Sequence, residues 1–263
     1  MRIASIAILT SFLFGAACSG QTLPASPLQT TSGTGFTGAP YSGKETSVDV
    51  KTAADGTRYT NTYVMYLWRD AEGRTRQERP EKSPSGIDIH SVIITDPVGG
   101  VYLKWSYGDE SMPKVMTIWP LAERQQVRAP AANQYAYATA PQYTPSSSAP
   151  RSCGNGCTVE TDRLSLQPIN GIRAFGTRTT RTFKAGTSEN GQDLVVTVAN
   201  EVWLSPDLAI IVCHINEDPR TGRSETDVTD IVPGDPDPSL FAAPEGYEVR
   251  DMRSRAAGTE WVR

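Results

Sequence analysis

The side chains that most often perform catalysis are few in this sequence. The chain has 263 residues and only two histidines, His90 and His214, each inside an apolar stretch. Acid–base or nucleophilic catalysis by histidine needs a positioned partner, and we expect both histidines to be hydrogen-bonded structural residues. No G-x-S-x-G, H-E-x-x-H or P-loop pattern is present. The sequence therefore predicts a protein that is not an enzyme.

Metal and cofactor sites are not expected either. The carboxylates lie mostly in turns beside proline, where turn formation explains them. Calcium ligation by four aspartates of residues 227–237 has a spacing that matches no calcium loop known to us. The sequence 33–38 fits G-x-G-x-x-G but lacks the strand and helix that a phosphate site requires. We predict no metal and no cofactor; the turn and calcium candidates are Asp96, Asp207, Asp218, Asp227, Asp230, Asp235 and Asp237.

Four cysteines remain as reactive side chains. Cys153 and Cys157 are separated by three residues, and in an exported protein this spacing indicates a local disulfide. Zinc binding would need further ligands, and the other candidates are scattered. Cys213 lies among Ile and Val within an expected strand, so we expect a buried free thiol.

The N-terminus predicts export. Residues 1–20 contain one early cation, Arg2, then an apolar run and small residues, as in a secretory signal. Gly15-Ala16-Ala17-Cys18 resembles a lipoprotein acylation motif, although Gly15 stands where an aliphatic residue is preferred. Cys18 is therefore a lipidation candidate that could anchor the chain to a membrane, and ordinary cleavage nearby is the alternative. Residues 21–44 are rich in Gly, Ser, Thr and Pro and predict a flexible tether.

Composition limits the partners. The net charge is −4, with 25 basic and 29 acidic residues, which argues against a nucleic-acid-binding protein. No run of about 20 apolar residues is present. The arginines of residues 172–184 could bind an anionic headgroup, but a solvated sheet face explains them better. The same interpretation applies to RTRQER at residues 74–79.

Alternating apolar and polar residues predict strands throughout residues 45–251. Turns recur every 8–14 residues or so, as in an antiparallel meander. Three expected strands at residues 193–232 form the most regular part, and Asn170-Gly171 is a strong hairpin turn. Ser239-Leu240-Phe241 should form one helical turn before a last strand. Residues 125–151, rich in Pro, Tyr and Ser, predict a mobile insertion, and residues 252–263 a tail.

The end of the chain carries a resemblance. A Trp-containing strand, Ser-Pro-Asp-Leu at 205–208, Asp-Pro-Arg-x-Gly at 218–222 and D-P-S-L-F-x-x-P-x-G-Y at 237–247 resemble uncharacterised exported proteins common in Acidobacteria. The order of strands is also similar to the LolA/LolB-like lipoprotein-carrier superfamily. This resemblance implies an all-β fold with a curved antiparallel sheet or half-open β-barrel, few short helical turns, and a cavity for acyl chains.

We therefore expect an exported protein, periplasmic or anchored to the outer membrane of a Gram-negative bacterium. It would bind lipid or another hydrophobic ligand in the concave face of its sheet. The alternative is a structural or protein-interaction module of the envelope without a small ligand, and two separate β domains remain possible. The aromatic residues expected to line a ligand site are Tyr63, Trp68, Tyr102, Trp105, Trp119 and Trp203.

Overall fold

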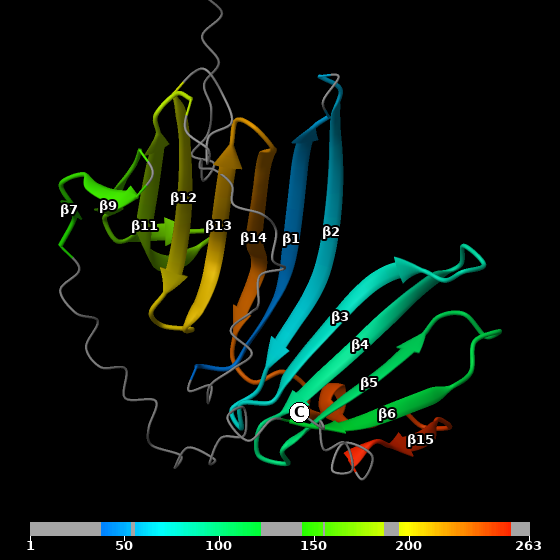
Figure 1. The fold of residues 1–263 in the computed structure, drawn as a ribbon. Coiled ribbons are helices and arrows are strands. Elements are labelled where there is room, and N and C mark those ends of the chain that lie inside the picture. Colours follow the sequence, from blue (N-terminus) through cyan, green and yellow to red (C-terminus); the bar gives the residue numbers. More distant parts are fainter. Residues whose placement is uncertain (1–37, 54–55, 122–143, 155, 187–194, 254–263) are drawn as a thin grey trace, which may run out of the picture.

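The computed structural model describes residues 38–53, 56–121, 144–154, 156–186 and 195–253. These residues form one open, curved sheet that is antiparallel except for one strand pair (Figure 1). The all-β class expected from the sequence is confirmed. The signal sequence, the tether to residue 37, residues 122–143 of the insertion region and the tail after residue 253 lie outside the described residues.

The first half of the sheet is an up-and-down meander in which each strand pairs with its successor in sequence. Its polar turns contain Asp, Gly and Pro, and its strands carry β-branched and aromatic residues. The strands are β1 (Tyr41–Thr52), β2 (Arg58–Arg69), β3 (Thr75–Lys82), β4 (Asp88–Asp96), β5 (Val101–Tyr107) and β6 (Val115–Pro120).

The second half adds the three regular strands expected near the C-terminal end and several shorter ones. One 3-10 turn, η2 (Pro238–Phe241), stands where the helical turn was expected, and the Asp237 carboxylate caps it by accepting from the Ser239 amide. The strands are β7 (Ser146–Ser147), β8 (Arg151–Gly154), β9 (Cys157–Arg163), β10 (Gln167–Ile169), β11 (Ile172–Phe183), β12 (Val196–Ser205), β13 (Ile210–Asp218), β14 (Gly222–Pro233) and β15 (Glu248–Asp251).

Two strand pairs join elements that are distant in sequence. β1 lies between β2 and β14. The first strand of the meander therefore also pairs with the last strand of the hairpin that β13 and β14 form. β15 pairs with β6 in the parallel direction, which departs from an entirely antiparallel sheet. We call β3–β6, β15 and η2 the small lobe and the remaining strands the large lobe; β2 and β3 diverge between them (Figure 1).

The small lobe is covered on one face by η2. Side chains alternate between faces along a strand, and this face, the η2 face, carries Val92, Ile94 and Trp105. Phe241 of η2 packs onto these side chains and is itself buried. Burying side chains of this size contributes about 1.5–3 kcal/mol each, so η2 fixes the C-terminal segment against the small lobe.

The large lobe is covered by the hairpin that β10 and β11 form. Its turn, Asn170-Gly171, has φ of 50° and 80° at these two residues, as the sequence pattern predicted for a tight hairpin. The Asn170 side-chain amide donates to the Asp227 carboxylate and to the Val228 carbonyl oxygen, each at 3.1 Å. The turn therefore reaches β14, and the hairpin lies across a core that includes Trp203.

Arg69 joins three distant segments near the point where the lobes meet. Its side chain is 2% exposed. The guanidinium donates from Nε (3.1 Å) and Nη2 (2.7 Å) to the Ala39 carbonyl oxygen, and from Nη2 to the Leu208 carbonyl oxygen. It also lies 4.9 Å from the centroid of the Tyr41 ring. A Cβ on Gly38 would lie 2.1 Å from Nη2 of this guanidinium. Only glycine at position 38 therefore allows the Arg69 side chain to lie this close to the backbone.

Replacement of Arg69 by lysine should destabilise the protein. Lysine carries a compact charge without the planar fork, so at least one buried carbonyl oxygen loses its donor. We expect the free energy of unfolding in urea to fall by about 2–4 kcal/mol. Arg58→Lys, at an exposed position of the same strand, is the matched control and should change it by less than about 0.5 kcal/mol. Equal effects of the two substitutions would contradict this role for Arg69.

Candidate functional site

Four polar side chains meet on the η2 face and form what we call the Glu78 cluster. Glu78 Oε1 lies 2.8 Å from His90 Nδ1 and accepts a hydrogen bond of 2.6 Å from the Tyr107 hydroxyl. Its other oxygen, Oε2, accepts from Arg76 Nη2. The residues come from β3, β4 and β5, where Val92 and Trp105 pair opposite each other and Glu78 pairs opposite Val92. The register of β3 against β4, and of β4 against β5, therefore places the four side chains next to one another on the same face.

The contacts within the cluster shift the pKa of Glu78 and that of Tyr107 in opposite directions. Burial opposes ionisation of Glu78, but the hydrogen bonds from Arg76, Tyr107 and His90 outweigh it and the pKa of Glu78 is lowered. Burial and the hydrogen bond to the Glu78 carboxylate raise the pKa of Tyr107 to about 12. Around neutral pH, Glu78 is thus a carboxylate that accepts and Tyr107 a hydroxyl that donates.

Arg76 ties this cluster to the core. Its guanidinium carbon lies 5.5 Å from the Trp68 ring centroid and 5.6 Å from the Trp105 ring centroid. Its Nη1 donates to the Leu240 carbonyl oxygen of η2 at 2.8 Å. The expectation of a solvated face for residues 74–79 is therefore wrong at Arg76 and Glu78, which are 9% and 7% exposed. Their spacing of two residues places both on the η2 face, where each has a partner.

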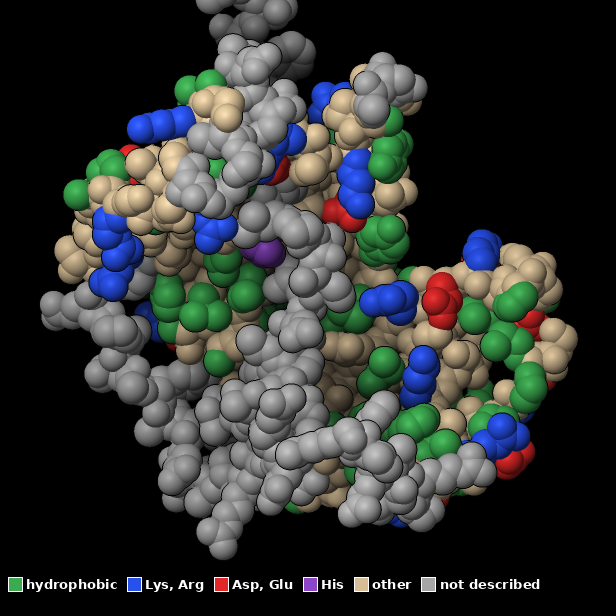
Figure 2. All heavy atoms as spheres, viewed as in Figure 1, with side chains coloured by type: hydrophobic (Ala, Val, Ile, Leu, Met, Phe, Trp, Pro, Cys, Tyr) green, Lys and Arg blue, Asp and Glu red, His purple; other side chains and the backbone are tan. Residues whose placement is uncertain are grey.

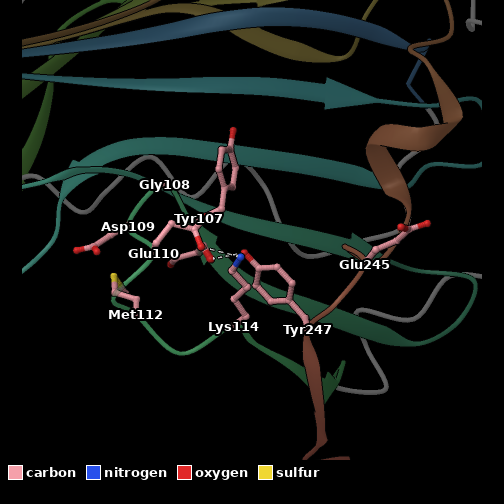
Figure 3. Close-up of a pocket in the computed structure, with 9 residues that line it drawn as sticks. Tyr107, Gly108, Asp109, Glu110, Met112, Lys114, Glu245 and Tyr247 are labelled. Carbon is pink, nitrogen blue, oxygen red and sulfur yellow. Dashed lines mark hydrogen bonds and ion pairs between the residues drawn. The ribbon is translucent and has the colours of Figure 1, made fainter.

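A pocket of about 300 Å³ adjoins the cluster at the end of β5 (Figure 3). Two tyrosines contribute to its wall, and the Tyr247 hydroxyl donates to the Ser106 carbonyl oxygen at 2.9 Å. Lys114 Nζ lies 2.9 Å from a Glu110 carboxylate oxygen, so this cation is already paired. The pocket is lined by Ser106, Tyr107, Gly108, Asp109, Glu110, Met112, Lys114, Glu245 and Tyr247.

A second buried carboxylate lies in the large lobe. Glu201 is 2% exposed. It accepts from Trp203 Nε1 at 2.7 Å and from Arg178 Nε at 2.6 Å. The three residues lie on neighbouring strands, β11 and β12, and satisfy one another. Because the Trp203 indole packs in the core and its N–H is satisfied internally, this residue is a packing residue of the fold.

The six aromatic candidates for a ligand site do not meet in one place. Trp105 and Trp203 are buried in two different core clusters, and Trp68 packs beside the first of them. Tyr63, on β2, is 54% exposed. Tyr102 and Trp119 pair across β5 and β6, opposite the η2 face; their ring centroids are 6.2 Å apart and their planes differ by 7°.

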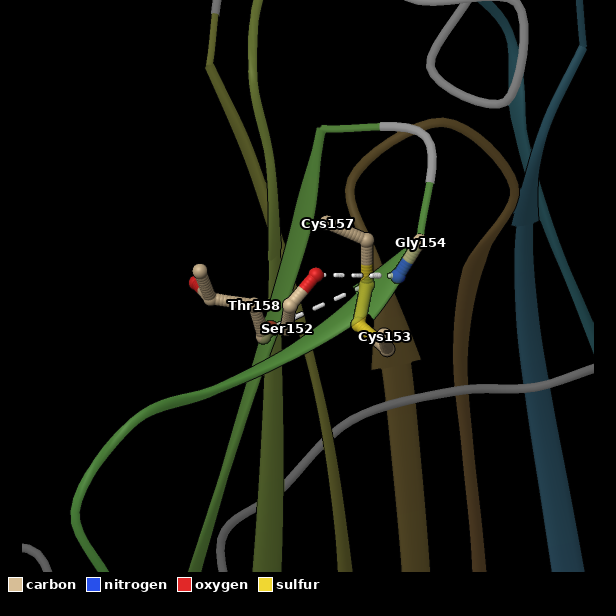
Figure 4. Close-up of a disulfide and its surroundings, with 5 residues drawn as sticks. All are labelled: Ser152, Cys153, Gly154, Cys157 and Thr158. Atoms are coloured by element: carbon tan, nitrogen blue, oxygen red, sulfur yellow. Dashed lines mark hydrogen bonds between the residues drawn. A yellow bond between two sulfur atoms is a disulfide. The ribbon is translucent and has the colours of Figure 1, made fainter.

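The structure joins Cys153 and Cys157 in a disulfide across the β8–β9 turn, with their Cα atoms 5.1 Å apart (Figure 4). Cys213 is also disulfide-bonded, so the expectation of a free thiol there is wrong. Cys213 is fully buried, as expected. Its apolar neighbours in the sequence predict burial equally for a free thiol and for a disulfide-bonded cysteine. The lipidation candidate Cys18 lies outside the described residues.

The two histidines lie in different lobes and have different surroundings. His90 stacks on the Tyr107 ring, with centroids 4.9 Å apart. His214 Nε2 lies 2.7 Å from the Asn200 side-chain nitrogen, and burial lowers the pKa of His214.

Within the described residues, no group of three or more His, Cys, Asp or Glu side chains is arranged to hold a metal ion. The described part of the chain also contains no helix with the length and apolarity needed to cross a membrane.

Comparisons with known proteins give weak likenesses only. No protein-family model and no curated protein matches the sequence. A LolA-superfamily protein from Nitrosomonas europaea matches with 12% identity and a TM-score of 0.28, over 79% of this chain and 92% of that one. A protein from Parabacteroides distasonis described as a candidate lipoprotein matches with 10% identity and a TM-score of 0.25, over 76% and 97%. We draw no functional conclusion from these scores.

Replacement of Glu78 by glutamine should lower stability in a pH-dependent way. The pKa of Glu78 in the folded protein lies below its unfolded value of 4.5. Ionised Glu78 therefore stabilises the fold above that pH, and this contribution is lost as the pH falls through the folded-state pKa. At pH 7 we expect Glu78→Gln to cost about 1–3 kcal/mol in urea unfolding.

The difference between wild type and Glu78→Gln should shrink on acidification. Glu81→Gln, at an exposed position of the same strand, is the matched control and should show little effect at either pH. A cost of Glu78→Gln that stays constant down to the acid-unfolding region would rule out the charged hydrogen bonds as its cause.

Proposed function

We propose that this chain is a non-enzymatic exported envelope protein that holds a lipid or another hydrophobic ligand on its sheet. The observation that carries the proposal is the parallel, half-buried ring pair of Tyr102 and Trp119. Aromatic side chains of this kind contribute large apolar contact areas. They lie opposite the η2 face, so their rings are not part of the core beneath η2. Together they offer a flat apolar platform to an acyl chain or a ring system.

A cation at the edge of this platform suggests the polar end of the ligand. Lys104 lies two residues after Tyr102 on β5, so both side chains project from the same face, about 7 Å apart along the strand. Lys104 is exposed. An amphiphile with an anionic headgroup, such as a fatty acid, would place its chain on the rings and its charge beside the ammonium. This narrows the six sequence candidates to Tyr102 and Trp119, with Lys104 added.

The state of the Glu78 cluster supports a non-enzymatic role. A general acid or base works best with a pKa near the operating pH and with a free position for the substrate proton. The pKa of Glu78 is lowered and that of Tyr107 is raised, so both move away from neutrality. Three neighbouring side chains donate to or contact the Glu78 carboxylate. We interpret the cluster as a support that holds β3, β4 and β5 in register behind the platform.

Export is the second part of the proposal. The secretory-type leader and the disulfide between Cys153 and Cys157 both favour an oxidising compartment such as the periplasm. Acylation at Cys18 would add anchoring at the outer membrane. Mass spectrometry of the mature N-terminus distinguishes an acylated Cys18 from ordinary cleavage nearby.

Ligand binding is tested with a fluorescent fatty acid and the purified mature protein. We expect saturable uptake by the wild type, and Trp119→Ala should weaken it about tenfold, corresponding to about 1.4 kcal/mol of lost apolar contact. Val98→Ala, at an exposed apolar position in the turn between β4 and β5, is the control and should bind as the wild type does. Absence of uptake, together with absence of co-purifying lipid in native mass spectrometry, would refute the proposal.

The charge of the ligand is tested separately. Lys104→Glu should weaken binding of the anionic probe and leave an uncharged long-chain alcohol unaffected, because only the anion gains from the ammonium. Lys51→Glu, at an exposed position on β1, is the matched control. If Lys104→Glu and Lys51→Glu lower fatty-acid binding equally, the effect comes from overall charge and the headgroup position assigned to Lys104 is wrong.

A structural or protein-interaction module is the second candidate. The observation that favours it is the unpaired outer part of β2, which presents strand backbone and exposed tyrosines. The two functions are compatible, because this edge and the aromatic platform lie on different strands. Most of the insertion at residues 125–151, including its three tyrosines, lies outside the described residues.

A further inference from the structure

Strand β2 is paired on one side along its whole length and on the other side only at its end. All 12 of its residues pair with β1. Its pairing with β3 covers only residues 66–69. Within the described chain, no strand pairs with the outer side of residues 58–65. Figure 1 shows the cause, since β3 turns away from β2 toward the small lobe, and in Figure 2 the space beside the upper part of β2 is an open notch.

The exposed edges on the two sides of this notch differ in chemistry. Exposed edges are commonly protected by charge and by proline, which discourage pairing with another chain. The end of β3 follows this rule with Arg79, Pro80, Glu81 and Lys82. Residues 59–63 of β2 carry no charge and no proline, and their tyrosines and threonines favour strand pairing. The edge of β2 is therefore the one suited to accept a partner strand.

The sequence of that edge is a palindrome. Residues 59–63 read Tyr-Thr-Asn-Thr-Tyr. If two copies align antiparallel about a two-fold axis at Asn61, Tyr59 of each copy faces Tyr63 of the other, and Thr60 faces Thr62. Aromatic pairs and threonine pairs stabilise facing strands by about 0.2–1 kcal/mol each. Tyr59 and Tyr63 are 48% and 54% exposed in the single chain, so their rings are available for such pairs.

We propose that two copies of this chain associate through antiparallel pairing of their β2 edges, with Asn61 on the two-fold axis. The edge is self-complementary, as an isologous interface requires, and within residues 59–63 every residue type recurs at the symmetric position. No like charges face each other in the paired segment, since its one charged residue, Arg58, lies opposite Val64. The dimer goes beyond ligand binding and leaves Tyr102 and Trp119 uncovered by the partner strand.

Sedimentation analysis of the purified mature protein tests the association. At about 100 μM, where a contact with a micromolar dissociation constant is populated, we expect a dimer. Asn61→Lys should convert it to a monomer, because two ammonium groups would face each other across the axis. Asn61 is exposed, so circular dichroism should show an unchanged fold. Val249→Lys, an exposed residue of the edge strand β15 at the far end of the sheet, is the matched control and should remain dimeric.

Cysteine pairing tests the register. Thr60→Cys and Thr62→Cys proteins, mixed and mildly oxidised, should form a mixed disulfide dimer, because these positions face each other within reach of a disulfide. Each protein alone should form far less, since Thr60 does not face itself. A monomeric wild type, a dimer that persists in Asn61→Lys, or equal cross-linking of the single and mixed samples would each overturn the proposal.

Discussion

The buried guanidinium of Arg69 is the interaction on which the arrangement of this protein depends. A charge removed from water must be matched by hydrogen-bond partners, or the fold loses several kcal/mol. Arg69 finds them in the backbone at Ala39 and Leu208. These carbonyls belong to the chain entering β1 and to the turn between β12 and β13. The side chain therefore fixes the N-terminal strand beside the C-terminal hairpin, and with it the junction of the two halves of the sheet.

Each lobe then builds its own core by covering one face of the sheet. A single sheet cannot bury both sides of its strands without additional elements. In the small lobe this element is η2, which places Phe241 on Trp105 and its neighbours. In the large lobe it is the β10–β11 hairpin, held to β14 by Asn170. These two covers decide which aromatic residues become core and which, like Tyr102 and Trp119, lie on the opposite side.

Local sequence patterns were sufficient for the elements but insufficient for the candidate site. Period-two alternation identified the strands, because backbone alternation is a local property. The Glu78 cluster was missed, since RTRQER contains charges that normally indicate solvent exposure. Only the pairing of β3 with β4, and of β4 with β5, shows that Glu78 has His90 and Tyr107 as partners. A buried polar residue is recognised by its partners, and these come from the following strands, whose register and buried face the charges of RTRQER do not show.

The sequence by itself determined the all-β class, the turns and the helical turn at η2, because Asn170-Gly171 and Asp237-Pro238 act through their own backbone preferences. Tertiary structure alone decided the neighbours: β1 beside β14, β15 parallel to β6, and the disulfide bonding of Cys213. It also decided that the palindrome at residues 59–63 lies on an unpaired edge. The physical reason is that conformation follows from short-range sterics, whereas pairing and burial follow from contacts between residues far apart in the chain.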